Sequence, residues 1–224
     1  MRMRIAIIGY GKMGHMIEQI ALERGHEIAA RIDIGDTFDL KGADVAIEFT
    51  TPATAEENIR KAWAQGVPVV CGSTGWKPEE LRVEGLELRE VDSKKLIVES
   101  KTGKTMLIWS SNYSVGVNIF FELNKALAAA MAAQPQYTPS IKEIHHIHKL
   151  DKPSGTAKTL SEAISHQLSA ISQVSIESIR EGEVPGTHEV TWDSEEDTIV
   201  ITHIAKGRRG FALGAVLAAE QMLK

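Results

Sequence analysis

Cysteine is almost absent from this chain: Cys71 is the single one among 224 residues. One cysteine can form neither an internal disulfide nor a zinc site of several thiolates, which favours a reducing compartment and predicts a cytoplasmic protein. Basic residues show no excess, because 25 Lys and Arg against 30 Asp and Glu leave a formal charge of −5, so we expect no nucleic-acid partner. Long apolar runs are also missing, and residues 1–9 are too short for a signal-peptide core or membrane span. We therefore expect neither export nor a membrane anchor.

The composition that remains is that of an ordinary globular chain, without internal repeats. Its first half alternates apolar runs of strand length with amphipathic helical stretches, which is typical of a parallel sheet with crossover helices. The expected elements are a strand–turn–helix–strand unit at 4–33, strands at 44–50, 67–71 and 106–110, and a helix at 52–65. This order predicts a doubly wound α/β domain of the Rossmann type.

The segment between Trp76 and Thr105 is charged and only weakly periodic. A short helix at 78–82 is the one element predicted within it. Its lysines most simply form a solvated surface: Lys94, Lys95, Lys101 and Lys104.

After Asn112 the pattern changes to a long Ala-rich helix followed by closely spaced strands. The expected elements are helices at 117–133 and 156–171, strands at 140–148, 174–180, 187–192 and 198–205, and a final helix at 211–223. Three strands without helices between them predict an antiparallel or mixed sheet, and hence a second, smaller α+β domain. The final helix follows a glycine-rich stretch and could return to the first domain.

Three glycines form the motif G-x-G-x-x-G directly after a predicted strand and at the start of a predicted helix: Gly9, Gly11 and Gly14. The first permits a tight turn, the second lets the backbone approach a pyrophosphate, and the third lets helix and strand pack closely. The helix N-terminus adds amide donors for the phosphates. Asp33 ends the second strand, where an acid binds ribose hydroxyls, whereas the nearby Arg31 could accept a 2′-phosphate. The choice between NAD and NADP stays open.

The loop at 72–75 follows the fourth predicted strand, at the edge where a doubly wound sheet places ligand-binding loops. We expect it to face the nicotinamide half of the cofactor, with Thr74 nearby, although a plain turn is the alternative. Cys71 precedes the loop and is a candidate thioester-forming nucleophile. No basic or imidazole partner is close in sequence, so a small apolar strand residue is the favoured interpretation.

Three of the eight histidines lie within four residues: His145, His146 and His148. On a strand, His146 and His148 would share one face while His145 points the other way, so a three-histidine metal site is awkward and we predict no metal. Histidine, with an ordinary pKa of about 6.5, can instead donate a proton at neutral pH.

The same segment continues into a Pro-Ser-Gly-Thr turn and a predicted helix start. Exposed amides at Gly155 and Thr156 would hold a carboxylate, reinforced by the charge of Lys149. The segment as a whole therefore predicts an anion site with an acid beside it.

Taken together, these motifs resemble those of the 4-hydroxy-tetrahydrodipicolinate reductases, also called dihydrodipicolinate reductases, of the diaminopimelate route to lysine. The matching pieces run in family order: GYGKMG at 9–14, EFTTP at 48–52, GSTG at 72–75, SSNYSVGVN at 110–118, EIHHIHKLDKPSGTA at 143–157, REGEVPGTHEV at 180–190 and THIAKGRRGFALGAV at 202–216. The histidine-rich string is highly specific for this family, far more so than the glycine motif.

The resemblance implies a role for each matching residue. His145 would donate the catalytic proton, and Lys149 would be the essential lysine, as acid or substrate anchor. The remaining substrate-carboxylate binders would be His146, Gly155 and Thr156. The cofactor contacts would be Gly9, Tyr10, Gly11, Lys12, Met13, Asp33, Gly72, Ser73, Thr74, Ser110, Ser111, Asn112 and Tyr113. The cofactor would be NADH or NADPH, with NADH slightly favoured by Asp33, and the substrate a small dicarboxylate.

The domain organisation follows from the same resemblance. We expect a dinucleotide-binding domain at 1–115, completed by the helix at 207–224, and a domain for substrate binding and tetramerisation at 116–206. This chain is shorter than common family members after Asp33 and between Val190 and Thr198, which could alter a homotetramer interface.

Two other functions are weighed against the reductase. A different Rossmann oxidoreductase, such as a semialdehyde dehydrogenase, would require a reactive Cys71. A nicotinamide-sensing protein without catalysis would require a broken acid or anchor position, and both His145 and Lys149 are intact.

Overall fold

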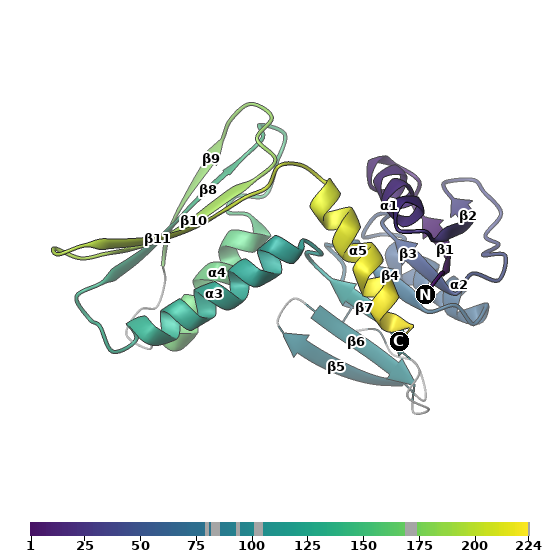
Figure 1. The fold of residues 1–224 in the computed structure, drawn as a ribbon, viewed down its shortest axis with the longest axis horizontal. Helices are drawn as coiled ribbons and strands as arrows, with labels where there is room; N and C mark the ends of the chain where they lie inside the picture. Colours follow the sequence, from purple (N-terminus) through teal and green to yellow (C-terminus); the bar gives the residue numbers. More distant parts are fainter. Residues whose placement is uncertain (79–80, 82–85, 93–94, 101–104, 169–173, 224) are drawn as a thin grey trace. The chain divides into compact units, whose positions relative to one another are not determined.

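The computed structural model describes residues 1–78, 81, 86–92, 95–100, 105–168 and 174–223. The chain forms two compact units, one made of Met1–Ser114 with Arg209–Lys224 and the other of Val115–Arg208 (Figure 1). Among the described residues, no helix combines the length and apolar character that crossing a bilayer requires.

The first unit is built on a seven-stranded sheet with the order β2-β1-β3-β4-β7-β6-β5. Five strands are parallel: β1 (Arg4–Ile8), β2 (Glu27–Ile32), β3 (Val45–Glu48), β4 (Val69–Cys71) and β7 (Thr105–Ser110). An antiparallel pair, β5 (Leu86–Asp92) and β6 (Lys95–Ser100), extends the sheet beyond β7. Weak periodicity conceals these two strands in the sequence, where a solvated surface is expected. The helix expected at 78–82 lies mostly outside the described residues.

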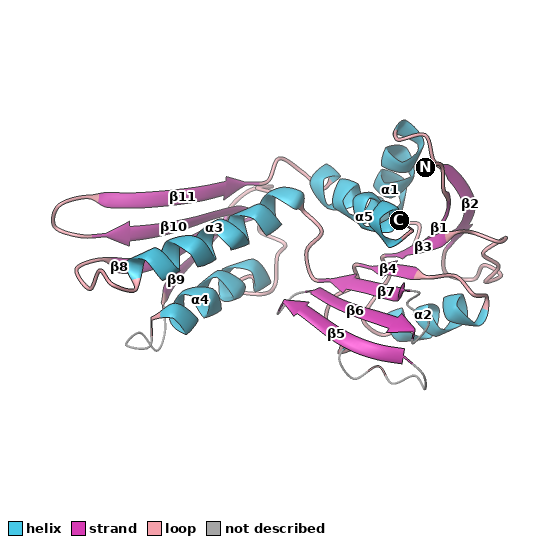
Figure 2. Ribbon diagram, turned by 60° about the horizontal axis from the view of Figure 1, so that its bottom comes forward, coloured by secondary structure: helices cyan, strands magenta, loops and turns pink. Residues whose placement is uncertain are grey.

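Helices cover both faces of this sheet. α1 (Lys12–Glu23) and α5 (Arg209–Met222) lie on one side and α2 (Ala55–Ala64) on the other (Figure 2). Alternate residues of β1 enter the two cores, with Ile5 and Ile7 packing toward α1 and α5, and Ala6 and Ile8 toward α2. The predicted doubly wound α/β architecture is confirmed.

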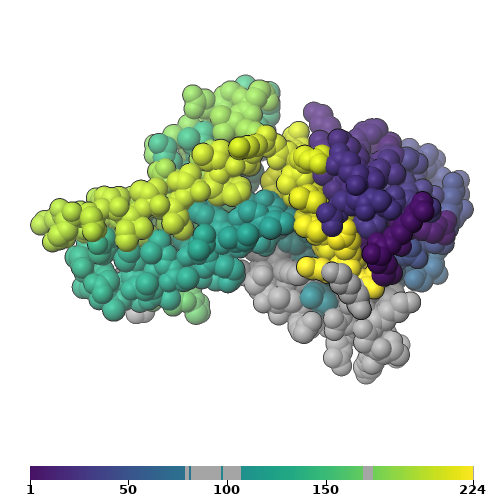
Figure 3. Space-filling model, in the orientation of Figure 1, coloured from purple at the N-terminus to yellow at the C-terminus, as the bar shows by residue number. Residues whose placement is uncertain are grey.

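The terminal helix α5 packs on α1, although the two are far apart in sequence (Figure 3). At Gly214 a Cβ would lie only 1.6 Å from the carbonyl oxygen of Tyr113, so the helix contacts that backbone directly. Near the C-terminal end of α5, Glu220 accepts hydrogen bonds from Arg24 Nε at 2.6 Å and from His26 Nε2 at 2.9 Å.

The second unit carries a four-stranded sheet with the order β11-β10-β8-β9. Its strands are β8 (Thr138–His145), β9 (Ser175–Arg180), β10 (Thr187–Asp193) and β11 (Thr198–Ile204). The pairs β10·β11 and β8·β10 are antiparallel and β8·β9 is parallel, so the predicted mixed sheet is confirmed. β8 ends at His145 instead of the expected His148, because a turn begins at His146, whose carbonyl accepts from Lys149 N.

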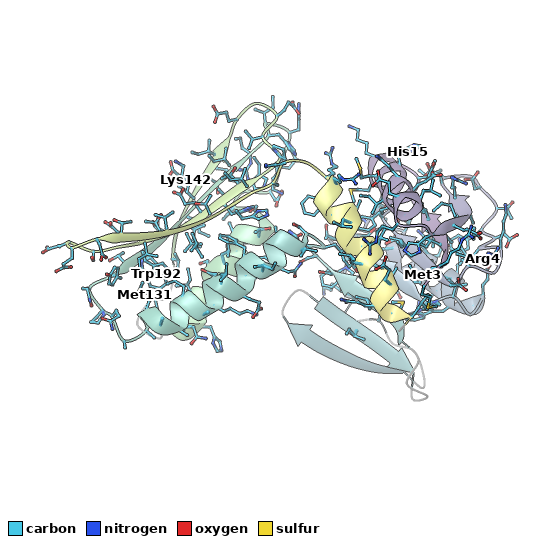
Figure 4. All side chains as sticks on the ribbon, viewed as in Figure 1. Met3, Arg4, His15, Met131, Lys142 and Trp192 are labelled. Carbon is cyan, nitrogen blue, oxygen red and sulfur yellow. The ribbon has the colours of Figure 1, made fainter. Side chains whose placement is uncertain are left out.

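Two helices cover one face of this second sheet, α3 (Val115–Met131) and α4 (Gly155–Gln167). The two helices and the sheet enclose a hydrophobic core, to which Trp192 and Met131, labelled in Figure 4, belong. α4 ends at Gln167, with Leu168 as its C-cap, so this helix ends earlier than the expected residue 171. Residues 169–171 lie outside the described part of the chain.

Candidate active site

The glycine motif forms the turn between β1 and α1. Gly9 has φ +92°, and a Cβ there would lie 2.3 Å from Phe49 O, while a Cβ on Gly14 would lie 2.4 Å from Gly9 O. A Cβ on Gly11 would instead have no atom within 4 Å, so this glycine faces open space. Gly11 is also the N-cap of α1 and provides no side-chain hydrogen bond to it. The open side and the uncapped amides fit a bound pyrophosphate.

Two charged residues lie at the end of β2: Asp33 is exposed, whereas Arg31 is paired with another side chain. Asp33 is exposed, and its Oδ1 accepts a hydrogen bond from Ile34 N at 2.9 Å. Arg31 is paired with Glu18 through Nε at 3.0 Å, and its guanidinium lies 5.8 Å from the centre of the Tyr10 ring. The hydrogen bond from Arg31 lowers the pKa of Glu18, so this pair stays charged at neutral pH. The guanidinium that could accept a 2′-phosphate is thus already paired.

Three further residues expected to contact the cofactor lie within or next to the glycine turn. Tyr10 and Met13 are half-buried, and Lys12 is exposed at the first position of α1.

A buried carboxylate, Glu48, joins the loops that follow β3 and β4. Its Oε1 accepts from Thr50 N at 3.0 Å and from Ser73 Oγ at 3.1 Å, and its Oε2 accepts from Cys71 Sγ at 2.9 Å. Sequence reasoning did not identify Glu48 as a functional residue. The available signal was a charged residue at the end of an otherwise apolar strand, since such a residue needs partners where it is buried.

Cys71 is buried in β4 and donates to Glu48. Burial raises the pKa of this thiol well above its ordinary value, and the neighbouring carboxylate adds to the effect. The thiolate that a nucleophile requires is therefore suppressed at neutral pH. This environment favours the interpretation of Cys71 as a strand residue over that of a catalytic nucleophile.

The loop after β4 is held by two indoles. Trp76 Nε1 and Trp109 Nε1 both donate to the carbonyl oxygen of Ser73, at 2.9 and 2.8 Å. Gly72 packs against Phe49, whose ring atoms would lie 2.1 Å from a Cβ at that position. Thr74 is exposed beside them. The loop therefore has a defined backbone at the carboxyl edge of the sheet.

The segment after β7 is also held by its own hydrogen bonds. Ser110 Oγ donates to Asn112 O at 3.0 Å, and Asn112 Oδ1 accepts from Ser114 N at 2.9 Å, while Ser111 is half-buried between them. The Tyr113 hydroxyl is buried 2.8 Å from Ile108 O. Because this ring serves the core, any cofactor contact from Tyr113 must come from its backbone.

In the second unit, four side chains from three strands meet at His145. Glu143 Oε2 on β8 contacts His145 Nδ1. Arg180 Nη2, at the end of β9, donates to Glu143 Oε1 at 2.9 Å. His188 on β10 is the register partner of Glu143, and its ring centre lies 5.0 Å from that of His145. Burial is the main cause that lowers the pKa of both histidines, that of His188 to about 3.

The substrate-binding residues that the sequence predicts follow directly after this cluster. Lys149 Nζ pairs with Asp151 Oδ1 at 2.7 Å. α4 begins at Gly155, with Ser154 as its N-cap, whose Oγ accepts from Ala157 N at 3.2 Å. A Cβ on Gly155 would have no atom within 4 Å, so the helix start faces open space.

The three predicted histidines have different surroundings. His145 is buried, whereas His148 is exposed and pairs with Glu183 at 3.1 Å, and half-buried His146 lies beside His148 with ring centres 6.0 Å apart. Sequence reasoning missed Glu143, Arg180 and His188 as members of the site. Glu143 carried a signal, because it lies two positions before His145 and shares its face of the strand.

One group of the described residues has the spacing for a metal ion: ligand atoms of Glu143, His145 and His188 lie within 4.8 Å of one another. Two of these side chains have committed hydrogen bonds, since Glu143 accepts from Arg180 and His188 Nε2 lies 3.0 Å from Ser154 Oγ. The arrangement favours a hydrogen-bonded network, and the absence of a metal stays a prediction.

Comparison with known proteins places both halves of the chain. Residues 3–113 match the family described as dihydrodipicolinate reductase, N-terminus, and residues 116–224 match its C-terminus. The 4-hydroxy-tetrahydrodipicolinate reductase of Christiangramia forsetii is 42% identical over 98% of this chain and 92% of that protein. The protein of the same name from Thermosipho africanus is 32% identical over 99% of this chain and 92% of that protein.

A solved structure has a similar fold. Dipicolinate-bound dihydrodipicolinate reductase from Paenisporosarcina sp. TG-14 aligns with a TM-score of 0.72 at 21% identity, covering 99% of this chain and 95% of that one. Since family matches cover both halves of the sequence and full-length relatives reach 42% identity, this chain belongs to the dihydrodipicolinate reductase family.

Proposed function

We propose that this protein catalyses the NAD(P)H-dependent reduction of 4-hydroxy-tetrahydrodipicolinate to tetrahydrodipicolinate in the diaminopimelate route to lysine. The observation that carries the proposal is the buried imidazole of His145, followed at once by Lys149 and the open N-terminus of α4. An acid and an anion site in that order suit the reduction of a ring that bears carboxylates. The single buried thiol supports a cytoplasmic location.

The chemistry divides between hydride and proton. Loss of water from the substrate ring leaves a conjugated double bond, to which a hydride adds at one carbon and a proton at its neighbour. A reduced nicotinamide held on the Gly9–Gly14 turn supplies the hydride when bound. His145 donates the proton and is reprotonated from solvent. Lys149 and the amides of Gly155 and Thr156, helped by His146, hold the carboxylates on a chain of net charge −5.

The activity is tested with substrate made in place from pyruvate and aspartate semialdehyde by the condensing enzyme. We expect loss of nicotinamide absorbance, with NADH and with NADPH, that depends on that enzyme. No oxidation of either cofactor, by protein that binds nucleotide, would contradict the proposal and leave the sensor alternative.

We further propose that NADH is the better cofactor, because Asp33 is exposed at the end of β2 and Arg31 is paired with Glu18. Replacing Asp33 by alanine removes the carboxylate that would bind the ribose hydroxyls and repel a 2′-phosphate. We expect the ratio of kcat/KM for NADPH to that for NADH to rise by about 10-fold, the effect of one charge-assisted hydrogen bond. Asp39→Ala, which removes another exposed carboxylate from the same loop, is the matched control, and an unchanged ratio in Asp33→Ala would show that Asp33 does not read the ribose.

We also propose that the second unit forms a homotetramer. Its edge strand β11 exposes Ile199, Val200 and Ile204, and exposed apolar residues on an edge strand favour association. Light scattering on the purified protein should give four times the mass of the 24.5 kDa chain. A monomeric mass would show that the short β10–β11 connection does not support the interface.

A further inference from the structure

We propose that Glu143 is a positioning residue for His145: its buried carboxylate holds the ring through Nδ1 and leaves Nε2 as the atom that gives its proton to the substrate. This inference rests on the proposed function, since it concerns how the same imidazole is oriented for its role as acid.

The two oxygens of Glu143 have separate partners. Oε1 accepts from Arg180 Nη2 at 2.9 Å and from Ser154 N at 3.3 Å. Oε2 contacts His145 Nδ1, two positions along the same strand. Glu143 is fully buried, and neither its Oε2 nor His145 Nδ1 has a hydrogen-bond partner elsewhere among the described residues. A hydrogen on Nδ1 directed at Oε2 would satisfy both atoms and fix the ring orientation and the tautomer.

The other side of the imidazole lies against a glycine. A Cβ at Gly186 would lie 3.0 Å from His145 Nε2, so any side chain there would press on the atom that is left to react. His188 packs on the ring at an interplanar angle of 71° and is occupied by Ser154 Oγ at 3.0 Å. Because burial lowers the pKa of His188 to about 3, it stays neutral and does not act as a second acid.

Glu143 also affects the pKa of His145, because it is the negative charge among the groups around the ring. Burial alone would raise the pKa of Glu143, but the hydrogen bond from Arg180 and the neighbouring histidine outweigh it, so the carboxylate is ionised at neutral pH. The groups that face His145 are Glu143 on β8, Lys149 after β8, Arg180 on β9 and His188 on β10. Among them, Glu143 raises the pKa of His145, whereas burial, Lys149 and Arg180 lower it.

The proton transfer then balances without any other group. The Nε2–H bond of the His145 imidazolium breaks as the C–H bond on the substrate forms. The imidazole that remains is neutral, with its hydrogen on Nδ1 donated to Glu143. Solvent returns a proton to Nε2 for the next cycle.

The test replaces Glu143 by glutamine, which keeps the shape and removes the charge, and by aspartate, which restores a carboxylate. Glu177→Gln, an exposed carboxylate on β9 of the same sheet, is the matched control. We expect Glu143→Gln to lower kcat by about 10- to 100-fold, less than loss of the imidazole, with KM for the nicotinamide unchanged. The alkaline fall of kcat/KM should move to lower pH by about one unit, because the remaining charges all oppose protonation of His145. Glu143→Asp should recover part of the lost kcat and part of the shift in the pH profile.

A second readout does not depend on turnover. Nitrogen-15 NMR of the imidazoles in wild-type protein, at mildly alkaline pH, should show His145 as the Nδ1–H tautomer, and Glu143→Gln should lose this preference. A wild-type Nε2–H tautomer would overturn the inference, even if Glu143→Gln fails to fold. A pH profile that does not move, in a folded Glu143→Gln variant, would also overturn it. If wild-type protein shows no reductase activity while the Nδ1–H tautomer is observed, the proposed function fails and the positioning of His145 stands.

Discussion

Replacing His145 by glutamine is expected to lower kcat by about 100- to 10 000-fold, the range that a well-placed general acid contributes. Glutamine fills much of the same volume and can accept a hydrogen bond, but it has no proton to give at neutral pH. The affinity for NADH, measured by fluorescence titration, should change little, because the glycine motif and Asp33 belong to the other unit. Steady-state kinetics with saturating substrate and cofactor measures the effect.

The matched control for this variant is His148→Gln. His148 is three positions away, is exposed and pairs with Glu183, which is also exposed, so its loss should leave kcat within a factor of about two. A His145→Gln variant that turns over at the wild-type rate would remove His145 from the role of acid.

Replacing Lys149 by alanine is expected to impair both substrate binding and turnover. Lys149 Nζ is partly buried and held by Asp151, so a substrate carboxylate would meet a preoriented ammonium group. Loss of one charge-assisted hydrogen bond, about 1.5–3 kcal/mol, corresponds to a KM for the substrate raised roughly 10- to 150-fold. We expect kcat to fall as well, because in the proposed mechanism Lys149 would help to hold the substrate ring beside His145.

Lys142→Ala serves as the control for loss of positive charge, since Lys142 lies on β8 next to Glu143, and alternation along the strand puts its side chain on the opposite face. Both variants are compared by initial rates over a range of substrate concentrations. A Lys149→Ala variant with wild-type KM and kcat would show that the carboxylate is bound elsewhere.

Much of the fold is predictable from local patterns. Runs such as residues 45–47 and 69–71 are buried on both faces and follow one another with a helix between, which is enough to indicate a parallel sheet. β5 and β6 are different, because their place at the sheet edge depends on pairing with β7, and charged residues in both strands hide the period of two.

The candidate site is less predictable than the fold. His145 and Lys149 lie in a distinctive string, and their roles stay predictions until the variants are measured. Their surroundings depend on contacts that a local pattern does not contain. His188 reaches the site because the β8·β10 register places it opposite Glu143, and Arg180 reaches it through the parallel pairing of β9 with β8. Strand register is a long-range property, so these partners become visible only in the folded chain.

The two indoles that hold Ser73 make this loop optically observable. Trp76 and Trp109 donate to the same carbonyl oxygen, directly beside Gly72 and Thr74, the residues expected to face a nicotinamide. Reduced nicotinamide absorbs light at the wavelengths where tryptophan emits. Occupation of the loop would therefore quench emission from these two residues by energy transfer. The protein thus contains its own fluorescent reporter of cofactor binding, and needs no attached label.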